Sequence, residues 1–171
     1  QLLGGTPNIN GSYFTPTYPR IITVANDGSG DFRLPSEALN YIASIPNTPL
    51  LSTNQLSYVV KVLPGIYNEP GNIEIPPNVC LLGESAINTN INFAVYDGNV
   101  IQASSNVEMG NLSLNNTYNI GSSNVYNTYM ITVVNSNNIY LHDLNITNSG
   151  DSAAQVGFNS SACDEVKLEN V

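Results

Sequence analysis

The chain has 171 residues, of which 42% are hydrophobic and 10% charged, and its formal net charge is -9. A chain of this length fits one domain with a sizeable core, and its acidic balance offers no basic surface to nucleic acid or anionic lipid. No apolar run approaches the roughly 20 residues of a membrane span. The first residues lack the regions of a signal peptide, so we expect either that the chain is not secreted by that route or that processing has removed its leader. We therefore expect neither nucleic-acid binding nor membrane insertion.

The first structural element should follow an extended arm. Residues 1–20 are rich in Gly, Pro, Thr, Asn and Tyr and show no periodicity, which is typical of an arm or linker. The apolar run IITVA at residues 21–25 predicts a strand, and the two glycines of DGSGDF predict a turn after it.

A single short helix is expected next. In LPSEALNYIASIP the apolar residues recur at helical spacing, with Ser36 as the candidate N-cap and Pro46 as the terminator. The segment NTPLLSTNQ then predicts a loop, and YVVKVL at residues 58–63 predicts a strand that ends at a Pro-Gly pair. The apolar side of the helix would consist of Leu39, Ile42, Ala43 and Ile45.

Beyond residue 64 the sequence is repetitive. Four segments share an apolar residue, any residue and an apolar residue, and three of them continue with Asn or Asp before a second apolar position. Each of the last three has an upstream strand-like partner, at residues 99–106, 130–137 and 154–161. The repeat is roughly 30 residues long, within the range of solenoid proteins. The leading apolar positions are Val79, Val107, Ile139 and Val166.

Short strands that recur without helices between them predict a β-solenoid, in which each coil buries an inward row of Val, Ile and Leu. Asparagine suits the corners, because it tolerates left-handed backbone and bonds its own chain in turns. The ends of a solenoid expose backbone groups and apolar side chains. The helix is therefore expected to cover the first coil, with the cap at residues 21–63 and the coils at residues 64–171.

The segments ITVANDGSGDF, SEALNYIASIP, YVVKVLPGIYNE and IEIPPNVCLLGE resemble, in order and wording, the N-terminal part of pectin methylesterases. More broadly, the chain resembles the pectin-lyase-like superfamily over residues 21–84. The resemblance implies an all-β fold, a right-handed parallel β-helix with a short N-terminal capping α-helix. The motifs build the cap and first coil in such proteins, so they specify the fold rather than an activity.

For activity, the resemblance implies a paired Asp nucleophile and acid, glutamines for the oxyanion, and an arginine. The nearest glutamine is Gln155, which is displaced from the family pattern, and the coils that would hold the two aspartates should follow Val171. Both arginines, Arg20 and Arg33, lie at or before the cap, so no cationic base for lyase chemistry is expected on the coils. The candidates for a catalytic role are Gln155, Asp143 and Asp151.

Other polar residues favour structural interpretations. His142 and Asp143 form an acid/base pair by type, but adjacent residues on a strand point to opposite faces, so we expect His142 to be a solvated surface residue. Asp143 aligns with Asn111 and Asn170 of neighbouring repeats and is expected to stabilise a turn. Scattered carboxylates without ligand spacing predict no metal site and no cofactor; they include Asp27, Asp31, Asp151, Asp164 and Glu165.

Tyrosines and cysteines complete the candidates. Exposed tyrosines stack on sugar rings or anchor interfaces, although packing on the solenoid flank is the alternative. Cys80 and Cys163 lie among apolar residues and are expected to be buried free thiols. Five Asn-x-Ser/Thr sequences, at Asn10, Asn111, Asn115, Asn145 and Asn159, are about as many as this composition gives by chance. The tyrosines with a candidate ligand-binding role are Tyr118, Tyr126, Tyr129 and Tyr140.

Two functional hypotheses follow. The first is a non-catalytic structural and attachment module of an extracellular or virion-surface assembly, of fibre or spike type, whose partners are copies of itself, other subunits or a glycan. The second is a carbohydrate esterase of pectin methylesterase type, as a fragment or divergent member. The absence of a complete set of catalytic residues favours the first hypothesis. The resemblance of the cap sequence to pectin methylesterases favours the second.

Overall fold

The computed structural model describes residues 20–45, 58–118, 127–150 and 154–171. Outside these residues lie the predicted arm except for its last residue, Arg20, the predicted loop after the helix, Tyr126 and Asp151. Within the described residues the chain forms one helix and a series of parallel strands. The elements are β1 (Arg20–Val24), α1 (Pro35–Ser44), β2 (Tyr58–Val62), β3 (Gly65–Asn68), β4 (Ile73–Ile75), β5 (Val79–Gly83), β6 (Thr89–Phe93), β7 (Gly98–Ala103), β8 (Val107–Tyr118), β9 (Asn127–Val134), β10 (Asn137–Gly150), β11 (Ala154–Ser161) and β12 (Asp164–Glu169).

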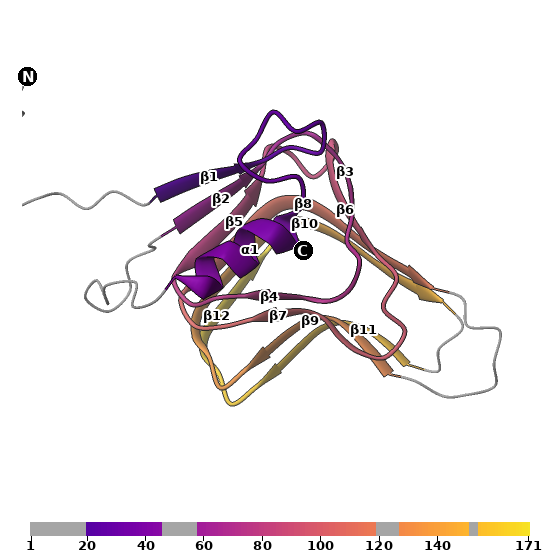
Figure 1. The fold of residues 1–171 in the computed structure, drawn as a ribbon. Coiled ribbons are helices and arrows are strands. Elements are labelled where there is room, and N and C mark those ends of the chain that lie inside the picture. Colours follow the sequence, from indigo (N-terminus) through magenta and orange to yellow (C-terminus); the bar gives the residue numbers. More distant parts are fainter. Residues whose placement is uncertain (1–19, 46–57, 119–126, 151–153) are drawn as a thin grey trace, which may run out of the picture.

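The strands wind into a right-handed parallel β-helix, as the sequence predicts. One eight-stranded sheet runs in the order β1-β2-β5-β8-β10-β12, with β3 and β6 paired alongside the second half of β8. A four-stranded sheet in the order β11-β9-β7-β4 closes the coil on another side. Figure 1 shows these layers around a common interior, with α1 in front of the coils. Each coil therefore has three sides, because β8 and β10 bend to form two of them.

The register confirms the predicted repeat. Val107 pairs with Ile139, and Ile139 pairs with Val166, so the leading apolar residues of successive repeats lie side by side. One position further, Cys80 pairs with Glu108, and Glu108 with Tyr140. Since side chains alternate across a strand, these two rows point to opposite faces of the sheet.

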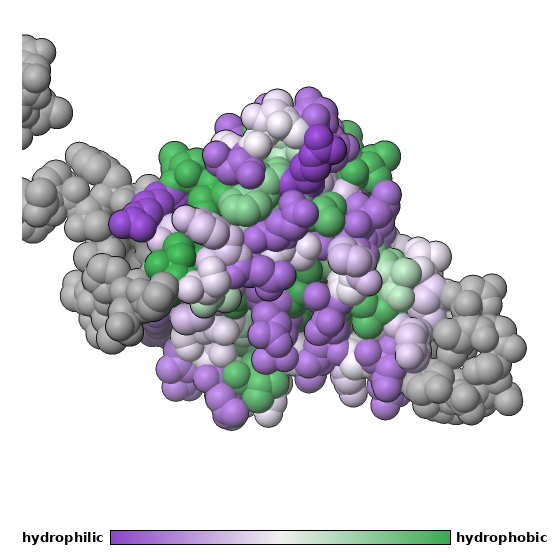
Figure 2. Space-filling view, viewed as in Figure 1, coloured by the Kyte–Doolittle hydropathy of each residue, from purple (hydrophilic) through white to green (hydrophobic). Residues whose placement is uncertain are grey.

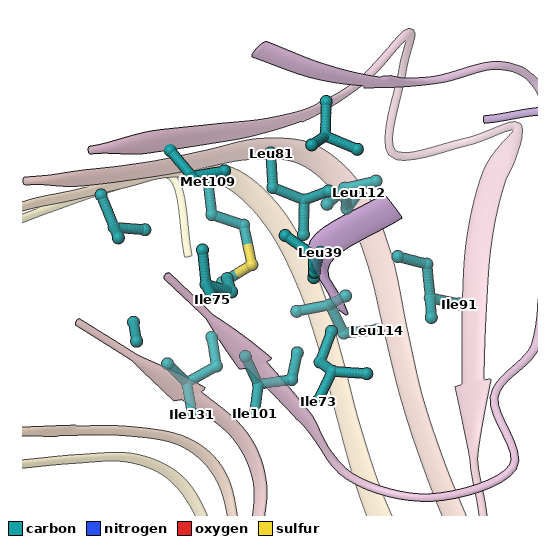
Figure 3. Packing of buried hydrophobic residues seen from close by; sticks show 14 of the residues in the cluster. Leu39, Ile73, Ile75, Leu81, Ile91, Ile101, Met109, Leu112, Leu114 and Ile131 are labelled. Carbon is teal, nitrogen blue, oxygen red and sulfur yellow. The ribbon is translucent and has the colours of Figure 1, made fainter. Parts of the chain in front are cut away.

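The core consists of stacked rows of aliphatic side chains. Leu81, Met109 and Leu141 follow one another in register and are fully buried. Ile101 and Ile131 form a second row on the four-stranded sheet. Figure 3 shows Leu81 and Met109 on one side of the interior and Ile101 and Ile131 on the other. Burying each such side chain contributes about 1.5–3 kcal/mol, so the stability of the fold is distributed along the solenoid.

The corners use left-handed backbone. Asn78, Asn106, Asn138 and Glu165 have φ between 56° and 64° at the residue before each leading apolar position. The left-handed region is uncommon for residues other than glycine, and Asn and Asp are enriched in it. A second set with the same conformation lies further along the repeats, at Asn111 inside β8, at Asp143 inside β10 and at Asn170 directly after β12.

Helix α1 packs against β1, β2 and β4 and covers the first coil, as predicted (Figure 1). Its buried face contains Leu39 and Ile42, but Ala38 is buried in place of the predicted Ala43, which is exposed. Ile45 follows the helix and is partly buried. The reason is the helical period: Pro35, Ala38, Leu39 and Ile42 recur at i, i+3, i+4 and i+7 and share one face, whereas Ala43 lies one residue past Ile42 and is turned away from it.

The N-terminus of α1 is not capped by Ser36, contrary to the sequence-based prediction. The N-cap is Leu34, and Ser36 lies in the first turn, where its N–H donates to Glu69 Oε1 at 3.0 Å. Glu37 Oε2 accepts from the backbone N–H groups of Arg33 and Leu34, at 3.0 and 3.1 Å. Glu69, which directly follows β3, therefore accepts from a backbone N–H at the start of α1 that a local cap would otherwise satisfy.

The surface shown in Figure 2 is predominantly hydrophilic, with scattered hydrophobic patches. Within the described residues, α1 is too short to cross a membrane, and no other helix is present there.

Candidate functional site

Polar side chains gather on the outer surface of β5, β8, β10 and β12. The register brings them together: the row of Cys80, Glu108 and Tyr140 continues to Lys167, and the row two residues further contains His142 and Glu169. We call this group the His142 cluster. Its members are Cys80, Glu108, Tyr140, His142, Asp143, Lys167, Glu169 and Asn170.

His142 lies at the centre of the cluster and is 13% exposed. Its Nε2 is 3.2 Å from Glu108 Oε1, and its Nδ1 is 2.9 Å from Asp143 Oδ2. The ring stacks on Tyr140, with centroids 4.7 Å apart and planes at 26°. Its Cε1 lies over Gly110, where an added Cβ would clash with the ring. The predicted solvated residue is instead held on every side.

The contact between His142 and Asp143 corrects the prediction that the two point apart. Asp143 has φ 50°, which interrupts the alternation of the strand and returns its carboxylate to the side of the imidazole. The same bend places Asp143 Oδ1 2.9 Å from Asn170 Nδ2, which donates to it. The hydrogen bond from His142, followed by that from Asn170, lowers the pKa of Asp143.

Tyr140, Lys167 and Glu169 form the outer part of the cluster. Tyr140 O–H donates to Glu169 Oε2 at 3.0 Å, and Lys167 Nζ lies 2.8 Å from the same oxygen. The ammonium is 4.6 Å from the centre of the Tyr140 ring. These bonds raise the pKa of Tyr140 and of Lys167 and lower that of Glu169, with Lys167 as the main cause for the carboxylate. All three groups are solvent-screened, so the pairs add little stability.

Cys80 lies beneath Glu108, with Sγ 3.5 Å from Glu108 Oε2. The residue is 2% exposed, and burial, with a smaller effect of the Glu108 charge, raises the pKa of its thiol to about 12. The thiol therefore stays protonated at neutral pH and is a poor nucleophile. Both cysteines are free, as predicted, although Cys163 is only half-buried.

The remaining candidate residues lie elsewhere or outside the described residues. Gln155 lies on β11 beside Thr128 of β9, where the structure describes only its backbone. Tyr118 is buried at the end of β8, and its O–H is 3.3 Å from Thr128 Oγ1. Tyr129 is half-buried on β9. Of the candidate tyrosines that the structure describes, Tyr140 belongs to the His142 cluster, whereas Tyr118 and Tyr129 lie outside it. Their ligand-binding role stays a prediction.

The acidic residues near the cap bind their own turns. Asp27 Oδ1 accepts from the Ser29 backbone and hydroxyl, and Asp31 Oδ2 accepts from those of Thr23. These hydrogen bonds lower the pKa of both carboxyl groups. In the part of the chain that the structure describes, no group of three His, Cys, Asp or Glu side chains is arranged to hold a metal ion.

Glu108 and Glu169 are members of the cluster that the sequence-based prediction does not include. A signal was available for Glu108: it follows the leading apolar residue of its repeat, as Cys80, Tyr140 and Lys167 do in theirs. When the repeats are aligned on their leading apolar residues, the next position in each repeat belongs to the outward-facing row that contains Glu108.

The solved structures that resemble this chain include two pectin methylesterases. One is a pectin methylesterase variant in complex with a hexasaccharide, with 21% identity over 87% of this chain and a TM-score of 0.46. The chain spans 49% of that protein's length. The other is a pectin methylesterase from carrot, with 13% identity, 87% of this chain and 66% of that one covered, and a TM-score of 0.37. No protein-family model and no curated protein matches the chain. The resemblance is one of fold.

Proposed function

We propose that this chain is a non-catalytic β-helix module that serves structure and attachment in an extracellular or virion-surface assembly of fibre or spike type. The observation that supports this proposal is the bonding of the His142 cluster. Glu108, His142 and Asp143 are the side chains whose chemistry could serve catalysis. His142 contacts both carboxylates, and Asp143 accepts from Asn170, so these contacts join successive coils.

A general base needs a free lone pair within reach of a substrate proton. Both ring nitrogens of His142 face carboxylates, and the ring is stacked on Tyr140. The neighbouring thiol of Cys80 is buried and protonated. The cluster therefore supplies neither an activated nucleophile nor an accessible base, and its interactions are those of a cross-strand network that holds coils together.

The partners that we propose are copies of this chain or other subunits of the assembly, and a glycan is the proposed ligand class. A low content of charge and an abundance of Asn, Ser, Thr and Tyr suit an extracellular surface that makes polar and aromatic contacts. Tyr129 is half-buried and retains exposed surface for such contacts.

The alternative function is that of a pectin methylesterase-like carbohydrate esterase. It rests on the amino-acid sequence of residues 21–84, which resembles the cap and first coil of that family. In this alternative Gln155, Asp143 and Asp151 are the candidate catalytic residues. Asp143 is already bonded to His142 and Asn170, which favours the structural function for this residue.

An assay of the purified 171-residue chain distinguishes the two functions. We expect no release of methanol from methylated pectin and no unsaturated product from polygalacturonate, with or without calcium. An active pectin methylesterase in the same buffers is the positive control. Methanol release clearly above the blank, lost in Gln155→Ala, Asp143→Asn or Asp151→Asn, would establish the esterase instead.

A further inference from the structure

The two contacts of His142 require two ring protons. An ionised carboxylate only accepts hydrogen bonds, so each ring nitrogen must carry a hydrogen to bond its partner. Neutral imidazole has one N–H and imidazolium has two. With Nδ1 2.9 Å from Asp143 Oδ2 and Nε2 3.2 Å from Glu108 Oε1, both bonds form only when the ring is protonated.

The surroundings keep the ring in this position. Gly110 leaves bare backbone under Cε1, and Tyr140 covers one face of the ring. A ring held in this way cannot turn to find another partner when it loses a proton. The titratable groups that face it from the adjoining strands are Cys80 on β5, Glu108 on β8, Tyr140 and Asp143 on β10, and Lys167 and Glu169 on β12.

We propose that His142 is a pH-sensitive clamp between β8 and β10. The protonated ring ties Glu108 of one coil to Asp143 at the bend of the next coil, and loss of a proton at higher pH releases one of the two bonds. Histidine is the side chain that ordinarily changes charge between pH 5 and 8. The clamp therefore tightens the C-terminal coils on mild acidification.

The sign follows from the charge states. The stability that the clamp contributes is present where the ring is protonated and is lost as pH rises. At the acidic end, the lowered pKa of Asp143 means that its contribution is present above the unfolded-state value and is lost only as pH falls through the lowered folded-state value. The clamp is thus fully formed in mild acid.

Nuclear magnetic resonance and thermal unfolding test the clamp directly. His142 is the one histidine of the chain, so its ring ¹⁵N signals are unambiguous, and we expect both nitrogens to be protonated at pH 5.5. Between pH 5.5 and pH 8 we expect the unfolding midpoint to fall by about 2–4 °C. His142→Gln should remove most of that difference. A ring that is neutral at pH 5.5, or an equal pH dependence in His142→Gln, would overturn the proposal.

Two matched carboxylate variants sharpen the test. In Glu108→Gln the amide N–H donates to the neutral ring, so the contact survives deprotonation and the pH difference should shrink. Glu74, an exposed residue of β4 on the four-stranded sheet, provides the control, and Glu74→Gln should keep the full difference. A full pH difference in Glu108→Gln, or its loss in Glu74→Gln, would contradict a clamp at this site.

Discussion

Asparagine side chains join successive coils of this protein at their corners. Asn106 Nδ2 donates to Asn78 Oδ1 at 2.9 Å, and Asn138 Nδ2 donates to Asn106 Oδ1 at 2.8 Å. On another side, Asn92 Nδ2 donates to Asn68 Oδ1 at 3.0 Å, and Asn115 Nδ2 to Asn92 Oδ1 at 3.2 Å. An amide both donates and accepts, so one residue type bonds to the coil before and the coil after. This explains why asparagine provides so much of the polarity.

Cys80 allows a test of burial at a single residue. Because the pKa of its thiol is raised to about 12, only about one thiol in 10⁴ is ionised at pH 8, and the thiolate is the species that reacts. We expect iodoacetamide to label native Cys80 far more slowly than the half-buried Cys163, as measured by peptide mass spectrometry. In denaturant the two rates should converge. Equal labelling of both cysteines in the native chain would show that Cys80 is accessible.

The sequence predicts which residues form the corners of the coils, but it does not predict the side-chain contacts of His142. The alignment of Asp143 with Asn111 and Asn170 identified a turn position, and all three have left-handed backbone. The contact of Asp143 with His142 was missed because strand alternation was applied across that turn. Glu108 is 34 residues from His142, and such a contact follows from the register of coils rather than from local pattern.

At the scale of the element, α1 is defined by an apolar stripe that the first coil buries. Leu39 is 1% exposed and Ile42 is 5% exposed. We expect Leu39→Asp or Ile42→Asp to lower the free energy of unfolding by several kcal/mol or to cause aggregation, because each buries an unpaired charge. Asn40→Asp, at an exposed position of the same helix, is the matched control and should change little. Equal denaturant midpoints for all three variants would mean that α1 does not cover the solenoid.

The strands and the helix could be predicted from periodicity, but the polar link between them could not. Glu69 is 6% exposed and reaches the Ser36 N–H from a position 33 residues away. The local sequence predicts Ser36 as the N-cap of α1, whereas in the fold the Ser36 N–H donates to Glu69 of the first coil. Long-range partners of this kind depend on how the cap sits on the coil, which no local window contains.

At the scale of the molecule, the first and the last described coils differ in what covers them. Helix α1 buries the first coil, whereas in the last coil Leu168 is 46% exposed and Val171 is 51% exposed. A groove at this end is lined by Ile146, Gly157, Phe158, Leu168, Asn170 and Val171. Among the described residues, no strand pairs with the outer edge of β11 or β12. Unpaired strand edges and apolar side chains are surfaces that soluble proteins normally cover.

These exposed apolar groups predict self-association of the isolated 171-residue chain. Strand edges and apolar groups at the last coil are stabilised when a second copy covers them, so light scattering at tens of micromolar should detect oligomers, with a trimer expected by analogy with fibres. Leu168→Lys should weaken the association, because it places a charge in the groove, while Lys61→Gln, on the exposed surface of β2, should leave it unchanged. A heat-stable monomer at the same concentration would contradict the predicted self-association of the isolated chain.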